Sequence, residues 1–241
     1  MMLMNDRVLC CIFNHNHNDD AVRWYEGLSP YFETVILDSG SNPPCRHTGA
    51  LVLPNIYYSG LMNKAYELLK QKGCRWLMIV TSDIEIDSAN LTRLVSAMDR
   101  ISHSTNVALY QPCCKLSLHG RALPQSVCHF TGKMRCTNFQ EGWFHMVCRE
   151  ILDEVLPIDT DVNKLGWGVD LALSHFARVH KMLVIVDDRV KVIHPKGTGY
   201  NRDAALAQMR QWHATISGYC SPRHFRPLKN TVTYDDCPGE S

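Results

Sequence analysis

The sequence predicts an α/β protein whose sheet is mixed and mainly parallel, with helices on both faces. Short apolar runs alternate with segments of helical periodicity through the first half of the chain. Polar or turn-forming residues follow several of these runs, as they do where parallel strands end. A length of 241 residues allows one large α/β domain or two small ones.

The first half divides into strands and helices in regular order. We expect strands over residues 7–13, 34–37, 50–53, 76–80 and 106–110. A helix is expected from Asn18, an N-capping residue followed by two aspartates that suit the positive end of a helix dipole. Two more helices are expected over residues 60–72 and 88–101, and Gly73 stops the first of them.

The second half is less regular. Residues 111–141 lose their periodicity, which predicts loops with short antiparallel strands. A helix is then expected within residues 143–155, followed by helices over 168–180 and 202–216 and strands over 182–186 and 190–193. Residues 221–241 are expected to form an irregular tail.

Composition excludes several classes of protein. With 45% hydrophobic residues, 20% charged residues and a formal net charge of +1, the chain resembles an ordinary soluble globular protein, and bulk charge implies neither nucleic acid nor a membrane surface as partner. The N-terminal apolar run is too short for a transmembrane segment and lacks the order of a signal peptide. We therefore expect a cytoplasmic protein.

The 11 cysteines form no CxxC pair, so reduced thiols are the simplest interpretation. The alternative is a zinc site, whose ligands would come from Cys113, His119, Cys128, His129, Cys136, His145 and Cys148.

Polar residues gather where the expected strands end. Ligands of open parallel sheets bind beyond the carboxyl ends of the strands, so these clusters are candidates for one cleft. Asp38, between a strand and Ser39-Gly40, is placed to accept hydrogen bonds from a ribose or a base. The alternative is an Asx-turn that only caps the strand.

The stretch VTSDIEID, residues 80–87, spaces three carboxylates at every second position. If it stays extended, Asp83, Glu85 and Asp87 face one side and offer oxygen ligands to Mg²⁺ or Mn²⁺. Asp87 or Ser88 is better placed as the N-cap of the next helix, so Asp83 is assigned to the metal and Glu85 is a helper. A solvated acidic turn is the alternative.

His194 follows a late strand and is placed to complete the coordination of a metal. Lys196, with the backbone of Gly197 and Gly199, is placed to meet a phosphate. A satisfied structural histidine is the alternative for His194.

Asp170 lies in the first turn of an expected helix, after Gly166-Trp167-Gly168. A carboxylate at this position can face a cleft and act as a general base. The alternative is an ordinary first-turn acid with Trp167 in the core.

Taken in order, these segments resemble the GT-A (Rossmann-like) glycosyltransferases and are most similar to glycosyltransferase family two. The resemblance covers about residues 7–200. The matching segments are Phe13-Asn14, Leu37-Asp38-Ser39-Gly40-Ser41, Gly60-Leu61-Met62-Asn63-Lys64-Ala65, Val80-Thr81-Ser82-Asp83, Gly166-Trp167-Gly168-Val169-Asp170 and His194.

The resemblance implies an inverting hexosyltransferase that takes a nucleotide-sugar, with a UDP-sugar favoured. It implies one domain over residues 1–220, with a nucleotide-binding half to about residue 110 and an acceptor-binding half after it. The acceptor would be a carbohydrate or glycolipid of surface-polysaccharide synthesis, with which peripheral membrane association is compatible. The nucleotide would contact Asn14, Asp38, Ser39, Gly40, Asn63 and Ser82. Asp83, Glu85 and His194 would hold Mn²⁺ or Mg²⁺, Asp170 would be the base, and Glu141, Gly142, Trp143 and Trp167 would line the acceptor side.

Two positions depart from the family pattern. Thr81 replaces the first aspartate of the DxD motif, and the paired acidic motif is reduced to Val169-Asp170. These losses keep a non-catalytic nucleotide- or sugar-binding relative as an alternative. A nucleotidyltransferase is a second alternative, but the residues after the first strand, Asn14 to His17, contain no glycine-rich phosphate loop.

Overall fold

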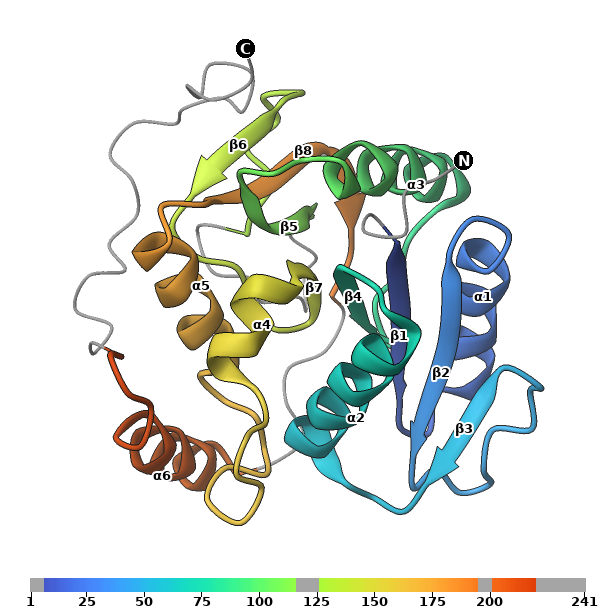
Figure 1. Ribbon diagram of the computed structural model, residues 1–241. Helices are drawn as coiled ribbons and strands as arrows, with labels where there is room; N and C mark the ends of the chain where they lie inside the picture. Colours follow the sequence, from blue (N-terminus) through green and yellow to red (C-terminus); the bar gives the residue numbers. More distant parts are fainter. Residues whose placement is uncertain (1–6, 116–125, 195–200, 220–241) are drawn as a thin grey trace.

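A computed structural model describes residues 7–115, 126–194 and 201–219 (Figure 1). In this part of the chain an eight-stranded sheet has the order β3-β2-β1-β4-β7-β5-β8-β6. The strands are β1 (Val8–Asn14), β2 (Glu33–Ser39), β3 (Ala50–Leu53), β4 (Trp76–Thr81), β5 (Val107–Cys114), β6 (Met134–Thr137), β7 (Phe144–Cys148) and β8 (Leu183–Val192). The helices are α1 (Asn18–Leu28), α2 (Tyr57–Lys72), α3 (Ser88–Ser102), α4 (Arg149–Val155), α5 (Val169–Val179) and α6 (Arg202–His213).

The sheet is mixed and mainly parallel, as the sequence predicts. Strands β3, β2, β1 and β4 pair in parallel, and so do β5 and β8. Strand β7 is antiparallel to both β4 and β5, and β6 is antiparallel to β8.

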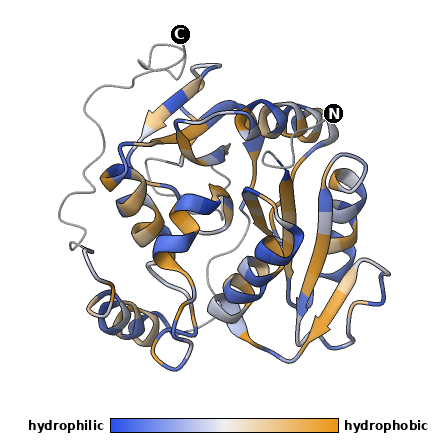
Figure 2. Ribbon diagram, viewed as in Figure 1, coloured by the Kyte–Doolittle hydropathy of each residue, from blue (hydrophilic) through white to orange (hydrophobic). Residues whose placement is uncertain are grey.

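The central strands are apolar on both faces because helices cover both faces. Every residue of β1 is buried, and five of the six in β4 are. Figure 2 shows these strands as largely hydrophobic, whereas hydrophilic residues occur along helices α1 and α2. Continuous Val, Ile and Leu runs are typical of parallel strands buried on both sides.

The helices form two layers. Helices α1 and α3 are neighbours on one face, where a Cβ atom at Gly27 would lie 2.5 Å from Leu91 Cδ2. Helix α2 packs beside α4 on the other face, where Tyr66 Oη donates a hydrogen bond of 2.6 Å to Asp153, and α5 packs on α4. None of the helices in the described ranges is both long and apolar enough to cross a membrane.

The strand order reverses between β1 and β4. From β1 the chain moves outward through β2 to β3, then returns through α2 to pair β4 with the other side of β1. Such a reversal opens a crevice at the carboxyl ends of the strands. Asn14 and Thr81 end β1 and β4, and Asp38 is the last residue but one of β2.

Most expected elements form within a few residues of their predicted bounds. The side chain of Asp87 accepts a hydrogen bond from Asn90 N, which confirms Asp87 as the N-cap of α3. Helix α2 begins three residues earlier than predicted, at Tyr57.

Two expectations in the second half are wrong. Residues 144–148 form strand β7 rather than the start of a helix, because they fill the gap between β4 and β5. The two expected strands around residue 187 are one strand, β8. The expected tail, residues 221–241, lies outside the described residues.

Candidate functional site

Asn14 connects the ends of the three strands at the reversal point. Its Nδ2 donates to Asp38 Oδ1 at 3.0 Å and to Asn18 Oδ1 at 2.7 Å. Its Oδ1 accepts from Ser82 Oγ at 3.1 Å. Since Asn14 and Ser82 are both buried, this amide holds the ends of β1, β2 and β4 together.

Asp38 is fully buried, and both of its carboxylate oxygens bind groups of the following loop. Oδ1 accepts from the hydroxyl of Ser41 in addition to Asn14, and Oδ2 accepts from Cys45 N at 2.8 Å. Such bonds to the following loop are what the alternative interpretation of Asp38, an Asx-turn that caps the strand, predicts. A contact between Asp38 and a nucleotide therefore stays a prediction.

Ser39 and Gly40 shape the same loop. Ser39 Oγ accepts a hydrogen bond of 2.9 Å from Ile56 N, which joins the end of β2 to the start of α2. Gly40 has φ +69°, and a Cβ atom there would lie 2.9 Å from Asn55 N, so the loop requires glycine at this position.

Asn63 lies in α2, and its side chain joins that helix to the segment after α4. Its Nδ2 donates to Ile158 O at 2.8 Å, and its Oδ1 accepts from Ile158 N at 2.7 Å. Both polar atoms of the Asn63 side chain are therefore bonded to the backbone of Ile158, and its contact with a nucleotide stays a prediction.

Asp83 and His194 are brought together by a short antiparallel bridge. Glu85 N donates to Ile193 O, and Ile193 N donates to Glu85 O, each at 2.9 Å. Beside this bridge, His194 Nε2 lies 3.8 Å from Asp83 Oδ2. Burial lowers the pKa of His194, although the charge of Asp83 opposes the shift, so the imidazole is neutral near pH 7 and free to bind a metal.

Glu85 does not join this pair. Its side chain is exposed, and no group of three ligand atoms within 4.8 Å of one another includes it in the described chain. Of the two geometries considered for residues 83–87, the segment takes the bent one, because Ile84 N donates to Thr81 O in a tight turn and Asp87 caps α3. A role of Glu85 at a metal stays a prediction, and the ligand set proposed below leaves this residue out.

Residues 142 and 143 connect the Asp83–His194 pair with Asp170, the predicted base. The rings of Trp143 and His194 lie 5.8 Å apart between centroids, and Thr81 N donates to Trp143 O at 3.0 Å. Tyr58 Oη donates to Gly142 O at 2.7 Å. A Cβ atom at Gly142 would lie 3.8 Å from Asp170 Oδ2, so a side chain at this position would contact the carboxylate.

Asp170 has the electrostatic properties of a general base. The pKa of this carboxyl group is raised to about 7, chiefly by burial and to a smaller extent by the nearby charge of Glu141. The backbone N–H of Leu171, 2.8 Å from Oδ1, and that of Gly142 oppose the shift by stabilising the anion. A carboxylate that titrates near neutral pH is suited to accept a proton from a hydroxyl group.

Helix α6 and the residues after it pack against the start of α5. His213 Nε2 hydrogen-bonds to Gly168 O at 3.0 Å, and the pKa of Tyr219 is raised to about 12 by burial and then by the charge of Asp170. Trp167 is only partly exposed, and its backbone oxygen accepts from Asn163 Nδ2 at 3.0 Å. Its predicted contact with an acceptor stays a prediction.

Sequence reasoning missed Tyr58 and Gln111, which hold residues 141 and 142, and it considered His145 only as a zinc ligand. Tyr58 holds Gly142 and packs edge-on against Phe13, with ring centroids 5.5 Å apart. Gln111 holds the same loop, with Nε2 donating to Glu141 O at 2.8 Å. His145 is fully buried, and burial lowers its pKa to about 3. Apolar periodicity placed none of them, because their contacts come from distant parts of the chain.

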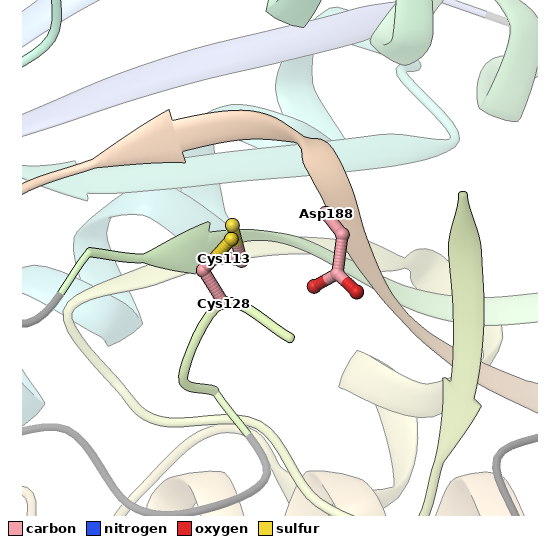
Figure 3. Close-up of side chains that lie close together, drawn as sticks. All are labelled: Cys113, Cys128 and Asp188. Atoms are coloured by element: carbon pink, nitrogen blue, oxygen red, sulfur yellow. The ribbon is translucent and has the colours of Figure 1, made fainter. Parts of the chain in front are cut away.

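A second group of potential ligands lies apart from these residues. Figure 3 shows Cys113 and Cys128 side by side with Asp188 near them, and their ligand atoms all lie within 4.8 Å of one another. Burial holds the pKa of the Cys113 thiol well above its usual range. Asp188 already pairs with Arg135, whose Nε lies 3.0 Å from both carboxylate oxygens.

This group does not fit Mn²⁺ or Mg²⁺, which prefer oxygen ligands. Of the residues considered for zinc, only Cys113 and Cys128 belong to it, while His119 lies outside the described residues, as do Lys196, Gly197 and Gly199.

The chain matches no family model and no curated protein sequence. It does resemble solved structures. One is glucosyl-3-phosphoglycerate synthase from Mycobacterium tuberculosis, in complex with Mn²⁺, UDP and glucosyl-3-phosphoglycerate, at 14% identity and a TM-score of 0.51 over 87% of this chain and 78% of that one. Another is GalNAc-T7 with UDP, GalNAc and Mn²⁺, at 12% identity and a TM-score of 0.55 over 87% of this chain and 48% of that one.

A third similar structure is a mycobacterial protein, at 14% identity and a TM-score of 0.51 over 87% of this chain and 73% of that one. At these identities the likeness establishes the fold. The chain therefore has the GT-A glycosyltransferase fold that the sequence predicted.

Proposed function

We propose that this protein is a metal-dependent glycosyltransferase that moves a sugar from a nucleotide-sugar to an acceptor hydroxyl group. The observation that carries the proposal is that a candidate metal-binding pair and a candidate general base lie near each other on a GT-A fold. The pair Asp83 and His194 lies at the ends of β4 and β8, and Asp170 is joined to it through residues 142–143.

The Asp83–His194 pair fits a divalent cation. A carboxylate oxygen and a neutral imidazole nitrogen 3.8 Å apart suit two positions around one ion, and neither side chain is fully buried. When bound, Mn²⁺ or Mg²⁺ would neutralise the charge that develops on the diphosphate leaving group. With Thr81 in the first position of the DxD motif, His194 supplies the second ligand from the protein.

The acceptor side supports direct displacement with inversion. The acceptor oxygen forms a bond to the anomeric carbon as the bond from that carbon to the diphosphate oxygen breaks. Asp170 takes the hydroxyl proton, for which a pKa of about 7 is suitable. Tyr58 fixes Gly142 beside the carboxylate, and Glu141 and Trp143 flank this glycine on the side assigned to the acceptor.

The finer assignments follow from the similar structures and from the sequence resemblance. Two similar proteins bind UDP together with Mn²⁺, which favours a UDP-sugar donor and Mn²⁺ here. We further infer a hexosyl group and a carbohydrate or glycolipid acceptor, as in polysaccharide synthesis.

The proposal is tested by calorimetric titration of the protein with UDP, GDP and CMP, with and without Mn²⁺. We expect one nucleotide to bind in a manganese-dependent way, and Asp83→Ala to remove that dependence. Glu85→Ala is the matched control, because it removes an exposed carboxylate two residues away. Binding without turnover of any sugar donor would support a non-catalytic binding protein, and no binding of any nucleotide would refute the proposal.

A further inference from the structure

A groove between helix α3 and strand β8 contains none of the residues assigned above to the candidate site. Its volume of about 830 Å³ falls in the range of small-molecule binding sites. One wall is the α3 face that carries Arg93, Ser96 and Arg100, and the other is residues 187–191 of β8. Phe130 closes one side.

The carboxylates in this groove are already neutralised. Asp187 is fully buried and pairs with Arg189, whose Nε and Nη2 each lie 2.8 Å from one carboxylate oxygen. Asp188 pairs with the buried Arg135. Two-point arginine pairs of this kind are strong, so these acids do not cancel the other positive charges of the groove.

Three further cations line the two walls of the groove. Arg93 and Arg100 are seven residues apart on α3, which places them two turns apart on one face. Lys191 faces them from β8. In the parts of the chain that the structure describes, neither Arg93 nor Lys191 has a carboxylate within 4.0 Å.

Phe130 provides an apolar surface beside these charges. Its ring is 73% exposed, and Lys191 Nζ lies 5.2 Å from the ring centroid. A left-handed backbone with φ +56° presents this side chain, although bulky residues rarely adopt that conformation. An exposed aromatic ring beside Arg93 and Lys191 suits a ligand with a charged end and an organic body.

We propose that this groove is a second binding site, which takes a phosphate ester. Arginine and lysine are the side chains that bind phosphate oxygens, and Arg93 with Lys191 would supply the donors from opposite walls. The organic part of the ester would pack on Phe130. The same chemistry is offered by a soluble phosphate compound and by the headgroup of a phospholipid.

The test uses the full chain and two double variants of equal charge change. Arg93→Gln with Lys191→Gln removes the groove donors. Lys70→Gln with Lys181→Gln is the matched control, because both lysines are exposed and lie outside the groove, Lys70 on α2 and Lys181 in the turn after α5. Binding is measured for inorganic phosphate and glycerol 3-phosphate by calorimetry, and for phosphatidylcholine vesicles with and without phosphatidic acid by sedimentation.

We expect the groove variant to weaken binding about tenfold or more, and the control to stay within about twofold, because hydrogen bonds to charged groups are specific to their geometry. Binding of the soluble probes would identify a soluble ester, and binding only to vesicles with phosphatidic acid would identify a lipid headgroup. The proposal is overturned if the unchanged protein binds no probe, if the groove variant binds as well as the unchanged protein, or if both variants lose binding equally.

Discussion

His194 Nε2 lies 3.8 Å from Asp83 Oδ2, although the two residues belong to opposite halves of the sequence. The bridge between Glu85 and Ile193 fixes this approach through the backbone, so it does not depend on either side chain. Substitutions of Asp83 and His194 therefore test metal binding with little effect on the fold.

The first prediction concerns His194. Replacing it with Ala should weaken Mn²⁺-dependent nucleotide binding at least about tenfold, because one of two protein ligands is lost. Glu85→Gln should leave binding unchanged, since this side chain is exposed and apart from the pair. Calorimetric titration of UDP at fixed Mn²⁺ measures both. Equal losses in the two variants would argue against the assigned ligand set.

The second prediction concerns the pH dependence of Asp170. Its folded pKa of about 7 exceeds the ordinary value of 3.8, so the folded state holds a proton that the unfolded state releases. The contribution of Asp170 to stability is therefore most favourable below about pH 4 and declines as the pH rises from about 4 to about 7. Asp170→Asn removes this cost and should stabilise the protein at pH 8 by up to about 4 kcal/mol, because each pKa unit corresponds to 1.36 kcal/mol.

Urea unfolding of both proteins at pH 5 and pH 8 measures this difference. The stabilisation by Asp170→Asn should be larger at pH 8, and the variant should lose about 10²-fold or more of its transfer rate. The kcat/KM of the unchanged enzyme should rise through about pH 7. An equal stability difference at both pH values would show that Asp170 is ionised normally in the fold.

The strands of the first half were predictable because their signal is local. The apolar run of β1 predicts a buried strand from its own residues alone. The polar residue Asn14 at its end marks the edge of the sheet where ligands bind. The same rule predicted that Asp83 and His194 share one region of the sheet. It required only strand ends and strand direction.

Strand β7 was not predictable from its own residues. An apolar run such as residues 144–148 fits a helix or a strand, and only its place between β4 and β5 decides. The charged residues Asp187 and Asp188 fall between two expected strands, yet they lie buried in β8, where Arg189 and Arg135 pair with them. Those partners are visible only in three dimensions.

The third prediction separates two roles for Asn63. Asn63→Ala should cost about 2–3 kcal/mol of stability, because Ile158 N and O both lose a hydrogen-bond partner. Nucleotide affinity of the folded variant should be unchanged. Asn63→Asp keeps the acceptor for Ile158 N. Its stability in urea unfolding should therefore lie between that of the unchanged protein and that of Asn63→Ala. A variant that keeps its stability but loses UDP binding would instead place Asn63 in the nucleotide site.

The last prediction contrasts two glycines beside Tyr58. A Cβ atom at Gly142 would lie 3.4 Å from Tyr58 Oη and 3.8 Å from Asp170 Oδ2, and the backbone of Gly142 is outside the left-handed region. Gly142→Ala should therefore fold with a stability change within about 1 kcal/mol. Its methyl group would occupy the space in front of the Asp170 carboxylate, so transfer should fall about 10²-fold while UDP affinity stays the same.

Gly166 also lies beside Tyr58, but unlike Gly142 it is required by the fold. It has φ +77°, and its added Cβ atom would lie 2.3 Å from Tyr58 Cδ1. Gly166→Ala should cost roughly 2–4 kcal/mol, because a left-handed alanine and a steric clash add together. Thermal unfolding and a transfer assay on both variants distinguish the roles. If Gly142→Ala transfers sugar at the normal rate, the acceptor hydroxyl does not reach Asp170 past this glycine, and the assignment of the base fails.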